Sequence, residues 1–188
     1  MTSTNSKDAI LAEATSIAQA HGYNGMNYRE LAERVGIKAA SIYHHFPSKA
    51  ELGAAVAKRY WETTVTELDA LASAAGDPTS ALREYPRIFR RSLEHDNRLC
   101  LCSFMSAEFD DLPAPVKAEV QTFADVNADW LAKMLAAADG SSVEDKAGKA
   151  RAIFSAVAGA QLFARSRADI SAFDDLIESY RASGLLPT

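Results

Sequence analysis

The chain has 188 residues, a formal net charge of −5 and a pI near 5.4, which together exclude a broadly basic protein that binds nucleic acid indiscriminately. No apolar run approaches the roughly 20 residues that cross a bilayer, and the two cysteines are too few for a disulfide-stapled scaffold and wrongly spaced for structural zinc. We therefore expect a cytoplasmic protein without a metal or cofactor.

The N-terminal residues predict a helix behind a short tail. Residues 1–7 are polar and lack the apolar segment of a signal peptide. A helix is expected over about residues 6–21, because apolar residues recur there at helical spacing and Gly22 follows. Alanine, which has the highest helix propensity, makes up roughly a fifth of the chain. Composition and pattern both predict an all-α fold.

Two short helical patterns come next, joined by a tight turn at residues 35–37. Asn27 and Glu30 have the spacing of a capping box, in which the two side chains satisfy backbone N–H groups of a helix start. A helix therefore begins at residue 28, and Gly36 can adopt the left-handed conformation that ends it. With a second helix over about residues 39–46, the pair forms a helix-turn-helix, which is a DNA-binding motif.

A long helix is expected directly after this motif. Pro47 cannot continue the preceding helix, and Ser48 with Glu51 forms a second capping box. The long helix then covers about residues 49–75 and ends before Pro78. It would connect the helix-turn-helix to the remainder of the chain.

The second short helix has a surface that suits a DNA groove. Ile42 and Phe46 point inward at helical spacing, whereas small and hydrogen-bonding side chains remain outside, where they can meet phosphate oxygens or base edges. Between residues 28 and 49 four basic residues stand against two acidic ones, a local balance of +2 in an acidic chain. This charge polarity would orient one end of the protein toward phosphates. The alternative is a three-helix packing unit with Tyr43 and Phe46 in its core.

The run from Leu31-Ala32 through the Val-Gly-Ile turn to SIYHHFPSK resembles the DNA-binding domain of the TetR family of transcriptional regulators, over about residues 8–60. The resemblance implies that residues 27–29 contact DNA, that residues 38–41 begin the recognition helix, and that Tyr43, His45 and Lys49 contact the DNA backbone. Some members carry base-reading polar groups where this chain has two alanines, so more specificity is expected from the polar neighbours. The candidate DNA-binding residues are Asn27, Tyr28, Arg29, Lys38, Ala39, Ala40, Ser41, Tyr43, His44, His45 and Lys49.

Further helices are expected over about residues 79–94, 99–109, 114–138, 143–166 and 170–184, separated by polar, Pro- or Gly-containing stretches. With the first four they make about nine. Their number and order again resemble the TetR family, in which the second domain binds a ligand and dimerises. We therefore expect a DNA-binding domain over residues 1–60 and a ligand-binding and dimerisation domain over residues 61–188.

The helix over 150–165 mixes large apolar residues with small ones that allow two helices to approach closely. Together with the last helix it predicts a four-helix dimer contact. A dimer could read a two-fold symmetric operator with recognition helices roughly 34 Å apart. The alternative is an ordinary buried helix. The candidate interface residues are Phe154, Val157, Gly159, Leu162, Phe173 and Leu176.

Apolar and aromatic residues of the middle helices could line a ligand cavity, with polar neighbours such as His95 and Gln161 orienting the ligand. Each of them could equally be plain core, because an aromatic stripe does not distinguish a cavity from a filled interior. The candidate pocket residues are Trp61, Phe89, Cys100, Phe104, Met105, Phe123, Asn127 and Trp130.

Cys100 and Cys102 lie at an expected helix start beside Arg98, where the helix dipole and the cation would lower a thiol pKa. The segment resembles the cysteine-bearing stretch of electrophile-sensing repressors of the same family. The alternative is that both thiols are buried as small apolar side chains. A disulfide between them is not expected, since residues two apart on a helix point in different directions.

These patterns predict a homodimeric, ligand-responsive transcriptional regulator, namely a repressor released from its double-stranded DNA operator by a small molecule or an electrophile. No catalytic residue is expected, because no phosphate loop, nucleophile elbow or metalloprotease motif occurs. One alternative is an all-α ligand-binding or scaffold protein that does not bind DNA. Another is a small helical enzyme that uses His95 with Glu108 or Asp110 as its acid–base set.

Overall fold

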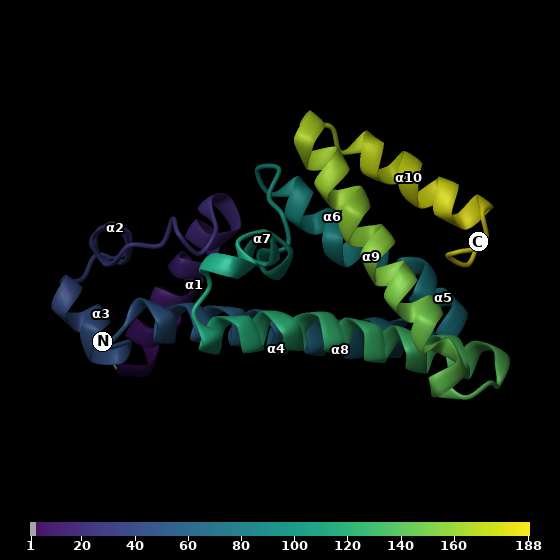
Figure 1. Cartoon of the computed structure of the whole chain (residues 1–188), viewed down its shortest axis with the longest axis horizontal. Coiled ribbons are helices and arrows are strands. Elements are labelled where there is room, and N and C mark those ends of the chain that lie inside the picture. The colour runs from purple at the N-terminus through teal and green to yellow at the C-terminus, as the bar shows by residue number, and fades with distance from the viewer. Residues whose placement is uncertain (1–2) are drawn as a thin grey trace. The chain divides into compact units, whose positions relative to one another are not determined.

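The computed structural model describes residues 3–188, with side chains from residue 6 onward. Helices account for all regular secondary structure in this range, which contains no strand, and the all-α prediction is confirmed (Figure 1). None of these helices is long and apolar enough to cross a membrane. The elements are α1 (Ser3–His21), α2 (Tyr28–Val35), α3 (Ala39–His45), α4 (Lys49–Ala75), α5 (Pro78–Glu84), α6 (Pro86–Glu94), α7 (Leu101–Ala107), the 3-10 helix η1 (Phe109–Asp111), α8 (Ala114–Asp139), α9 (Val143–Arg167) and α10 (Ser171–Ala182).

The helix-turn-helix and the long helix after it begin where their caps predict. The Asn27 side chain accepts a hydrogen bond from the Glu30 N–H at 2.8 Å, and Ser48 Oγ accepts one from the Glu51 N–H at 3.2 Å. Gly36 takes the left-handed conformation with φ of 74° and ends α2. These interactions are local, so the sequence alone specifies them.

Two expected elements differ from the structure. The single helix expected over residues 79–94 is instead two helices, because Pro86 has no N–H to donate and interrupts the hydrogen-bond ladder although Tyr85 keeps helical dihedral angles. At the N-terminus, α1 already begins at Ser3, within residues 1–7 that were expected to form a short polar tail. Residues 1–2 of that tail lie outside the described residues.

The residues divide into two compact units. Unit 1 comprises the residues up to Glu62 together with Leu101–Phe123, and unit 2 comprises Thr63–Cys100 together with Ala124–Thr188. In unit 1, α1 packs against α2 and α7, and α2 packs against α3. A DNA-binding domain that ends at residue 60 stays a prediction. Unit 1 itself is built from two separate stretches of the chain.

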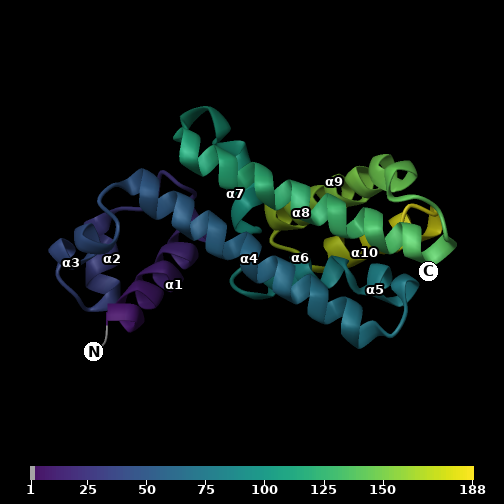
Figure 2. The ribbon, with the colours of Figure 1, turned by 90° about the horizontal axis from the view of Figure 1, so that it is seen from below.

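In unit 2, α9 packs against α6 and α10, which lie beside it in both ribbon views (Figures 1 and 2). Gln161 of α9 is fully buried, and its amide group donates to the Phe89 carbonyl at 2.6 Å and accepts from the Cys100 N–H at 3.0 Å. Both ends of the Gln161 amide are therefore used inside the fold. In addition, the Arg90 guanidinium makes two hydrogen bonds of 2.8 and 2.9 Å to the Asp174 carboxylate, and these bonds join α6 to α10.

Candidate nucleic-acid interface

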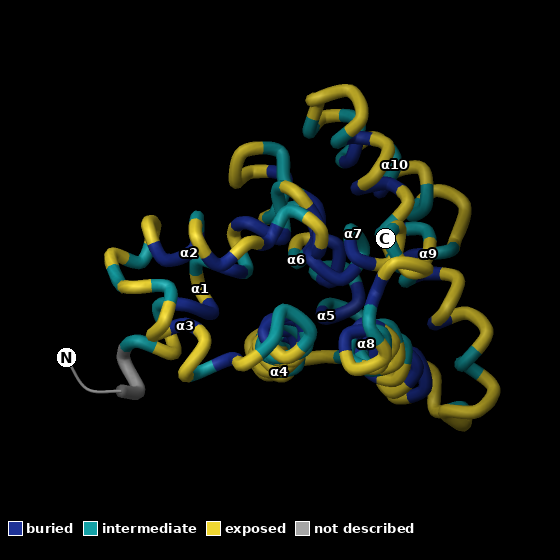
Figure 3. Tube along the Cα trace, turned by 60° about the vertical axis from the view of Figure 1, so that its left-hand side comes forward, coloured by how far each residue is buried: buried dark blue, intermediate teal, exposed yellow. Residues whose placement is uncertain are grey.

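The helix α3 presents an open polar face over a buried one. Ile42 is fully buried, whereas Ala40, Ser41 and His44 are exposed and the Tyr43 side chain is 56% exposed. Most residues of α3 are exposed, whereas the trace of α2 alternates between buried and exposed residues (Figure 3). The outward side chains of α3 are the ones predicted to face a DNA groove. The alternative reading, in which this segment is only packing core, fits Phe46 but not Tyr43.

Tyr28 is buried and supports this face from below. Its hydroxyl donates a hydrogen bond of 2.8 Å to the Phe46 carbonyl oxygen, and its ring centroid lies 4.5 Å from that of Tyr43. Burial, reinforced by nearby Tyr43 and Glu51, raises the pKa of Tyr28 to about 12. Tyr28 thus holds Tyr43 and the end of α3 in place, and its contact with DNA stays a prediction.

Tyr28→Phe is expected to lower the free energy of unfolding by about 1 kcal/mol, because a buried hydrogen bond is lost while the ring contact remains. In the native protein the raised pKa favours the neutral phenol, so this contribution is complete below about pH 10 and is lost as the pH rises toward 12. Urea unfolding of both proteins at pH 7 and pH 11 measures the difference. Equal stability of the two proteins at pH 7 would contradict it.

Three basic side chains lie on α2 and at the start of α3. Arg29 is 91% exposed and sits 3.4 Å from Glu33, an exposed pair that contributes little and can open to admit a phosphate. Arg34 is held more closely, 2.7 Å from Glu30. Lys38 is exposed at the start of α3 and makes no ion pair with any described residue. Of these three cations, Arg29 and Lys38 are thus less tightly held by carboxylates than Arg34.

Lys49, a predicted DNA-backbone contact, is only partly open to solvent. Its Nζ donates to the Asn24 carbonyl at 3.1 Å and lies 4.8 Å from the centre of the Tyr23 ring. Burial lowers the pKa of Lys49, and the nearby Glu108 carboxylate opposes that shift. The ammonium group is therefore positioned by the turn between α1 and α2.

The Glu108 carboxylate, which is distant in the sequence, accepts hydrogen bonds from the same turn. Its Oε2 accepts from the Tyr23 N–H at 2.6 Å, and its Oε1 lies 3.4 Å from the Asn24 N–H. Gly22 precedes these residues with a φ of +70°, and a Cβ there would lie 2.6 Å from Glu108 Oε1. Sequence reasoning considered Glu108 only as an acid–base partner and missed this role, since no local pattern links residues 85 apart.

The candidate pocket residues fall in both units. Trp61, Phe104, Met105 and Phe123 belong to unit 1, and Phe89, Cys100, Asn127 and Trp130 belong to unit 2. Several are engaged inside their own unit: the Trp61 Nε1–H donates to Glu119 at 2.7 Å, and Asn127 accepts from the Tyr85 hydroxyl at 2.9 Å. The assignment of these eight residues to one cavity stays a prediction.

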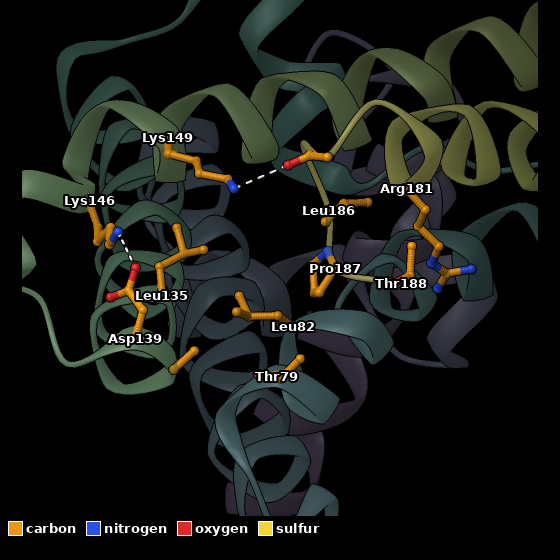
Figure 4. A pocket seen from close by; sticks show the side chains of 12 residues that line it. Thr79, Leu82, Leu135, Asp139, Lys146, Lys149, Arg181, Leu186, Pro187 and Thr188 are labelled. Atoms are coloured by element: carbon orange, nitrogen blue, oxygen red, sulfur yellow. Dashed lines mark hydrogen bonds and ion pairs between the residues drawn. The ribbon is translucent and has the colours of Figure 1, made fainter.

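Unit 2 contains hollows, and not all of them were indicated by the sequence. One of about 330 Å³ is lined by the apolar Leu82, Leu135 and Leu186 with basic side chains around them, and Figure 4 shows Lys146 turned toward Asp139 and Lys149 toward the Gly184 carbonyl. None of the candidate pocket residues lines it. A second, of about 500 Å³, lies between α4 and α8 and includes Trp130.

Both cysteines are buried, and they form no disulfide. Cys102 lies in the first turn of α7, as expected, and Cys100 directly precedes the helix. Arg98, the expected activating cation, lies 3.8 Å from Asp96. A reagent would therefore reach the thiols only through local opening of the structure.

The candidate dimer residues divide by exposure. Val157 and Phe173 are buried within unit 2, and Phe154 packs edge-on against Phe89 with ring centroids 6.2 Å apart. Gly159 is exposed, and Leu162 is 59% exposed beside Phe163 at 42%. Leu176 is half-buried on α10. The outward part of α9 is thus apolar around residues 162–163.

The sequence of the helix-turn-helix region matches a known family. Residues 10–56 match the sequence model described as "Bacterial regulatory proteins, tetR family". The transcriptional activator FasR of Mycolicibacterium smegmatis is 29% identical over 89 residues, 47% of this chain and 41% of its own length, so the match spans under half of that relative. The transcriptional repressor KstR of the same organism is 28% identical over 144 residues, 77% of this chain and 69% of its own.

The fold agrees with this family over nearly the whole chain. A TetR transcriptional regulator from Legionella pneumophila superposes with a TM-score of 0.87 at 26% identity, covering 94% of this chain and 96% of the other. The similarity thus includes both units as well as the helix-turn-helix. The family is one of transcriptional regulators and not of enzymes. The chain is therefore similar to the TetR family of transcriptional regulators in the sequence of residues 10–56 and in its fold.

Proposed function

We propose that the protein is a homodimeric repressor that binds a two-fold symmetric operator and leaves it when a small molecule binds. The observation that carries the DNA contact is the exposed face of α3, where small and polar side chains stand over buried Ile42 and are flanked by Arg29 and Lys38. A helix with such a face can enter the major groove and reach base edges. In a chain with a net charge of −5, a local basic face favours specific over indiscriminate binding.

Tyr43→Ala is expected to weaken operator binding about tenfold, because an exposed aromatic hydroxyl next to the recognition face loses its phosphate contact. Fluorescence anisotropy with DNA from around the coding region, at a stated salt concentration and with excess unrelated DNA, measures this. Phe109→Ala removes another exposed aromatic ring of unit 1 and serves as the matched control. Because an operator can lie away from the coding region, a negative result is followed by selection from random DNA sequences. If the protein binds neither DNA specifically, the alternative of a scaffold without DNA binding replaces this proposal.

The direction of regulation rests on the relatives. FasR is named as an activator and KstR as a repressor, and KstR matches over the larger share of both chains. We therefore favour repression. A reporter gene behind the selected operator tests it, since repression requires expression to rise when the regulator is deleted. A fall in expression would instead make the protein an activator.

The dimer is supported by the apolar surface of α9, where exposed Leu162 and Phe163 adjoin the small Gly159. Such side chains are normally covered when they cluster with small residues that allow close approach. Leu162→Glu is expected to raise the dimer dissociation constant at least about tenfold, since the charge would be buried in the contact. Sedimentation equilibrium measures it, with Val143→Glu as a control at an exposed apolar position of the same helix.

Release by an electrophile is the variant of this proposal that uses Cys100 and Cys102. Their burial means that modification would have to force the surrounding helices apart, which links reaction to a change of structure. Treatment with N-ethylmaleimide, followed by the operator-binding measurement, tests the idea on wild type and on Cys100→Ser/Cys102→Ser. Unchanged operator affinity after complete alkylation would exclude the thiol mechanism and leave reversible ligand binding.

A further inference from the structure

The turn between α1 and α2 is held by a side chain from a distant part of unit 1. Glu108 directly follows α7 and is half-buried. The Tyr23 N–H donates to its Oε2 at 2.6 Å, and the Asn24 N–H donates to its Oε1 at 3.4 Å. Hydrogen bonds from backbone N–H groups to a carboxylate are stronger than those between neutral groups. Glu108 therefore fixes the position of two successive peptide groups.

The same two residues hold Lys49, the first residue of α4. The Lys49 Nζ donates to the Asn24 carbonyl oxygen at 3.1 Å and lies over the Tyr23 ring, 4.8 Å from its centre. Lys49 thus uses the carbonyl and the ring of these residues, whereas Glu108 uses their N–H groups. The Tyr23–Asn24 segment links the Glu108 carboxylate to the Lys49 ammonium group.

The Tyr23 ring is itself closely packed against α4. Gly53 lies one helical turn after Lys49, so the two residues share a face of α4. A Cβ at residue 53 would lie 2.6 Å from Tyr23 Cε2, and the absence of a side chain at Gly53 lets the ring lie this close. Tyr23 is only 6% exposed. The surface on which the Lys49 ammonium rests is therefore confined by packing as well as by Glu108.

A lysine that is held in this way loses less freedom when it binds a phosphate. The ammonium group has three N–H donors, and the Asn24 carbonyl oxygen accepts from one of them, so the others can reach a phosphate oxygen. A lysine side chain is otherwise a flexible stem whose rotamer freedom is lost on binding. Ordering the side chain before binding raises affinity, because that loss is already complete in the free protein.

We propose that Glu108 is a positioning residue for DNA binding, because its hydrogen bonds to the Tyr23–Asn24 segment hold the Lys49 ammonium group in place for a phosphate. The proposal rests on the DNA-binding function above and gives a role to a residue outside the helix-turn-helix. It has an unusual sign. If only charge mattered, removing a carboxylate from a DNA-binding unit would strengthen binding, since like charges repel. The loss of Glu108 is instead expected to weaken it.

Glu108→Ala is expected to weaken operator binding about tenfold. Glu108→Gln removes the same charge but keeps an oxygen acceptor, so it should bind within about threefold of the wild type. Asp111→Asn removes an exposed carboxylate of η1 and should bind at least as tightly as the wild type. Fluorescence anisotropy with a selected operator, at a stated salt concentration, measures the affinities. Circular dichroism checks that each variant is folded, and Glu108→Asp, which is one methylene shorter, replaces Glu108→Ala if the latter does not fold.

A double-mutant cycle separates positioning from a general structural role. In the Lys49→Ala background, Glu108→Ala should change operator affinity by less than about twofold, because the group that Glu108 positions is absent. If Glu108 only kept the unit folded, its loss would cost the same affinity in both backgrounds.

The position of Lys49 can also be followed without DNA. The Lys49 ammonium group lies over the Tyr23 ring, so the ring current should move the proton resonance of the adjacent Lys49 Cε upfield. NMR of protein labelled with ¹³C-lysine, with Lys49→Arg for assignment, identifies this signal. Glu108→Ala should move it toward the resonance of an exposed lysine such as Lys38.

The two measurements have distinct outcomes. Operator binding by Glu108→Ala that equals or exceeds that of the wild type overturns the proposal. An equal loss in the Lys49→Ala background also overturns it, as does an unchanged Lys49 resonance in Glu108→Ala. A wild-type protein that binds no specific DNA refutes the proposed function instead, and the Lys49 resonance then still shows whether Glu108 holds the ammonium group.

Discussion

Gly22→Ala is expected to lower the free energy of unfolding by about 2–3 kcal/mol. Roughly 1 kcal/mol arises because alanine disfavours the left-handed conformation that Gly22 adopts at φ +70°. The rest arises because the new methyl group displaces the Glu108 carboxylate, which then leaves the Tyr23 N–H without its partner at 2.6 Å. Urea denaturation followed by circular dichroism measures the change.

Gly36→Ala is the matched control, because Gly36 has a nearly identical φ of +74° but no atom lies within 4 Å of the added Cβ. It is expected to lose only the roughly 1 kcal/mol of the backbone strain. The double variant Gly22→Ala/Glu108→Ala removes the clash, so its destabilisation should be smaller than the sum of the two single effects. Equal losses in Gly22→Ala and Gly36→Ala would show that the carboxylate moves aside freely.

Ala40→Glu is expected to weaken operator binding by about a hundredfold while leaving stability nearly unchanged. Ala40 is exposed on α3, so glutamate, a good helix former, fits the free protein. In the complex it would both hold α3 away from the groove floor and place a carboxylate among phosphates, and like charges there cost several kcal/mol. Anisotropy with operator DNA, paired with thermal unfolding, separates the two effects.

Ala118→Glu provides the comparison, since Ala118 is an exposed alanine on α8 and the change in net charge is the same. It should weaken DNA binding only slightly, through a general repulsion that salt screens. Comparable losses in Ala40→Glu and Ala118→Glu at 150 mM salt would mean that α3 does not enter the groove. The proposed interface would then need to be placed elsewhere on the protein.

The features that sequence predicted well are those fixed by near neighbours. The start of α2 follows from Asn27 and Glu30, its end from Gly36, and the start of α4 from Ser48, because each interaction spans only a few residues. The exposed side of α3 follows in the same way from helical spacing around Ile42. These local rules were enough to indicate the family.

The contacts between distant residues could not be predicted from sequence. Glu108 reaches the Tyr23 N–H, and Gln161 joins Phe89 to Cys100, only because the tertiary fold brings these segments together. Their sequence context is ordinary for a helical surface, so nothing marked them. Gln161 was considered as a ligand-orienting group, yet both ends of its amide are already used.

The burial of individual side chains likewise could not be predicted from the sequence alone. Helical spacing placed Val157 and Leu162 on candidate contact surfaces, but only the packed structure shows that Val157 is fully buried and Leu162 exposed. The hollow beside Trp130 depends on the small Ala72 and Ser73 standing across from a large ring. That pairing of helix faces is decided by tertiary packing and not by any local signal.

The composition of unit 1 matters to anyone who would exchange DNA specificities between regulators. Leu101–Phe123 belongs to the same compact unit as the N-terminal residues. A hybrid joined at about residue 60 would therefore receive the recognition helix without Glu108, whose carboxylate accepts a hydrogen bond from the Tyr23 N–H. Such a hybrid would inherit Gly22 and Lys49 with a foreign neighbour in place of that carboxylate. Grafts that carry both stretches together should transfer operator preference, and natural recombination would face the same constraint.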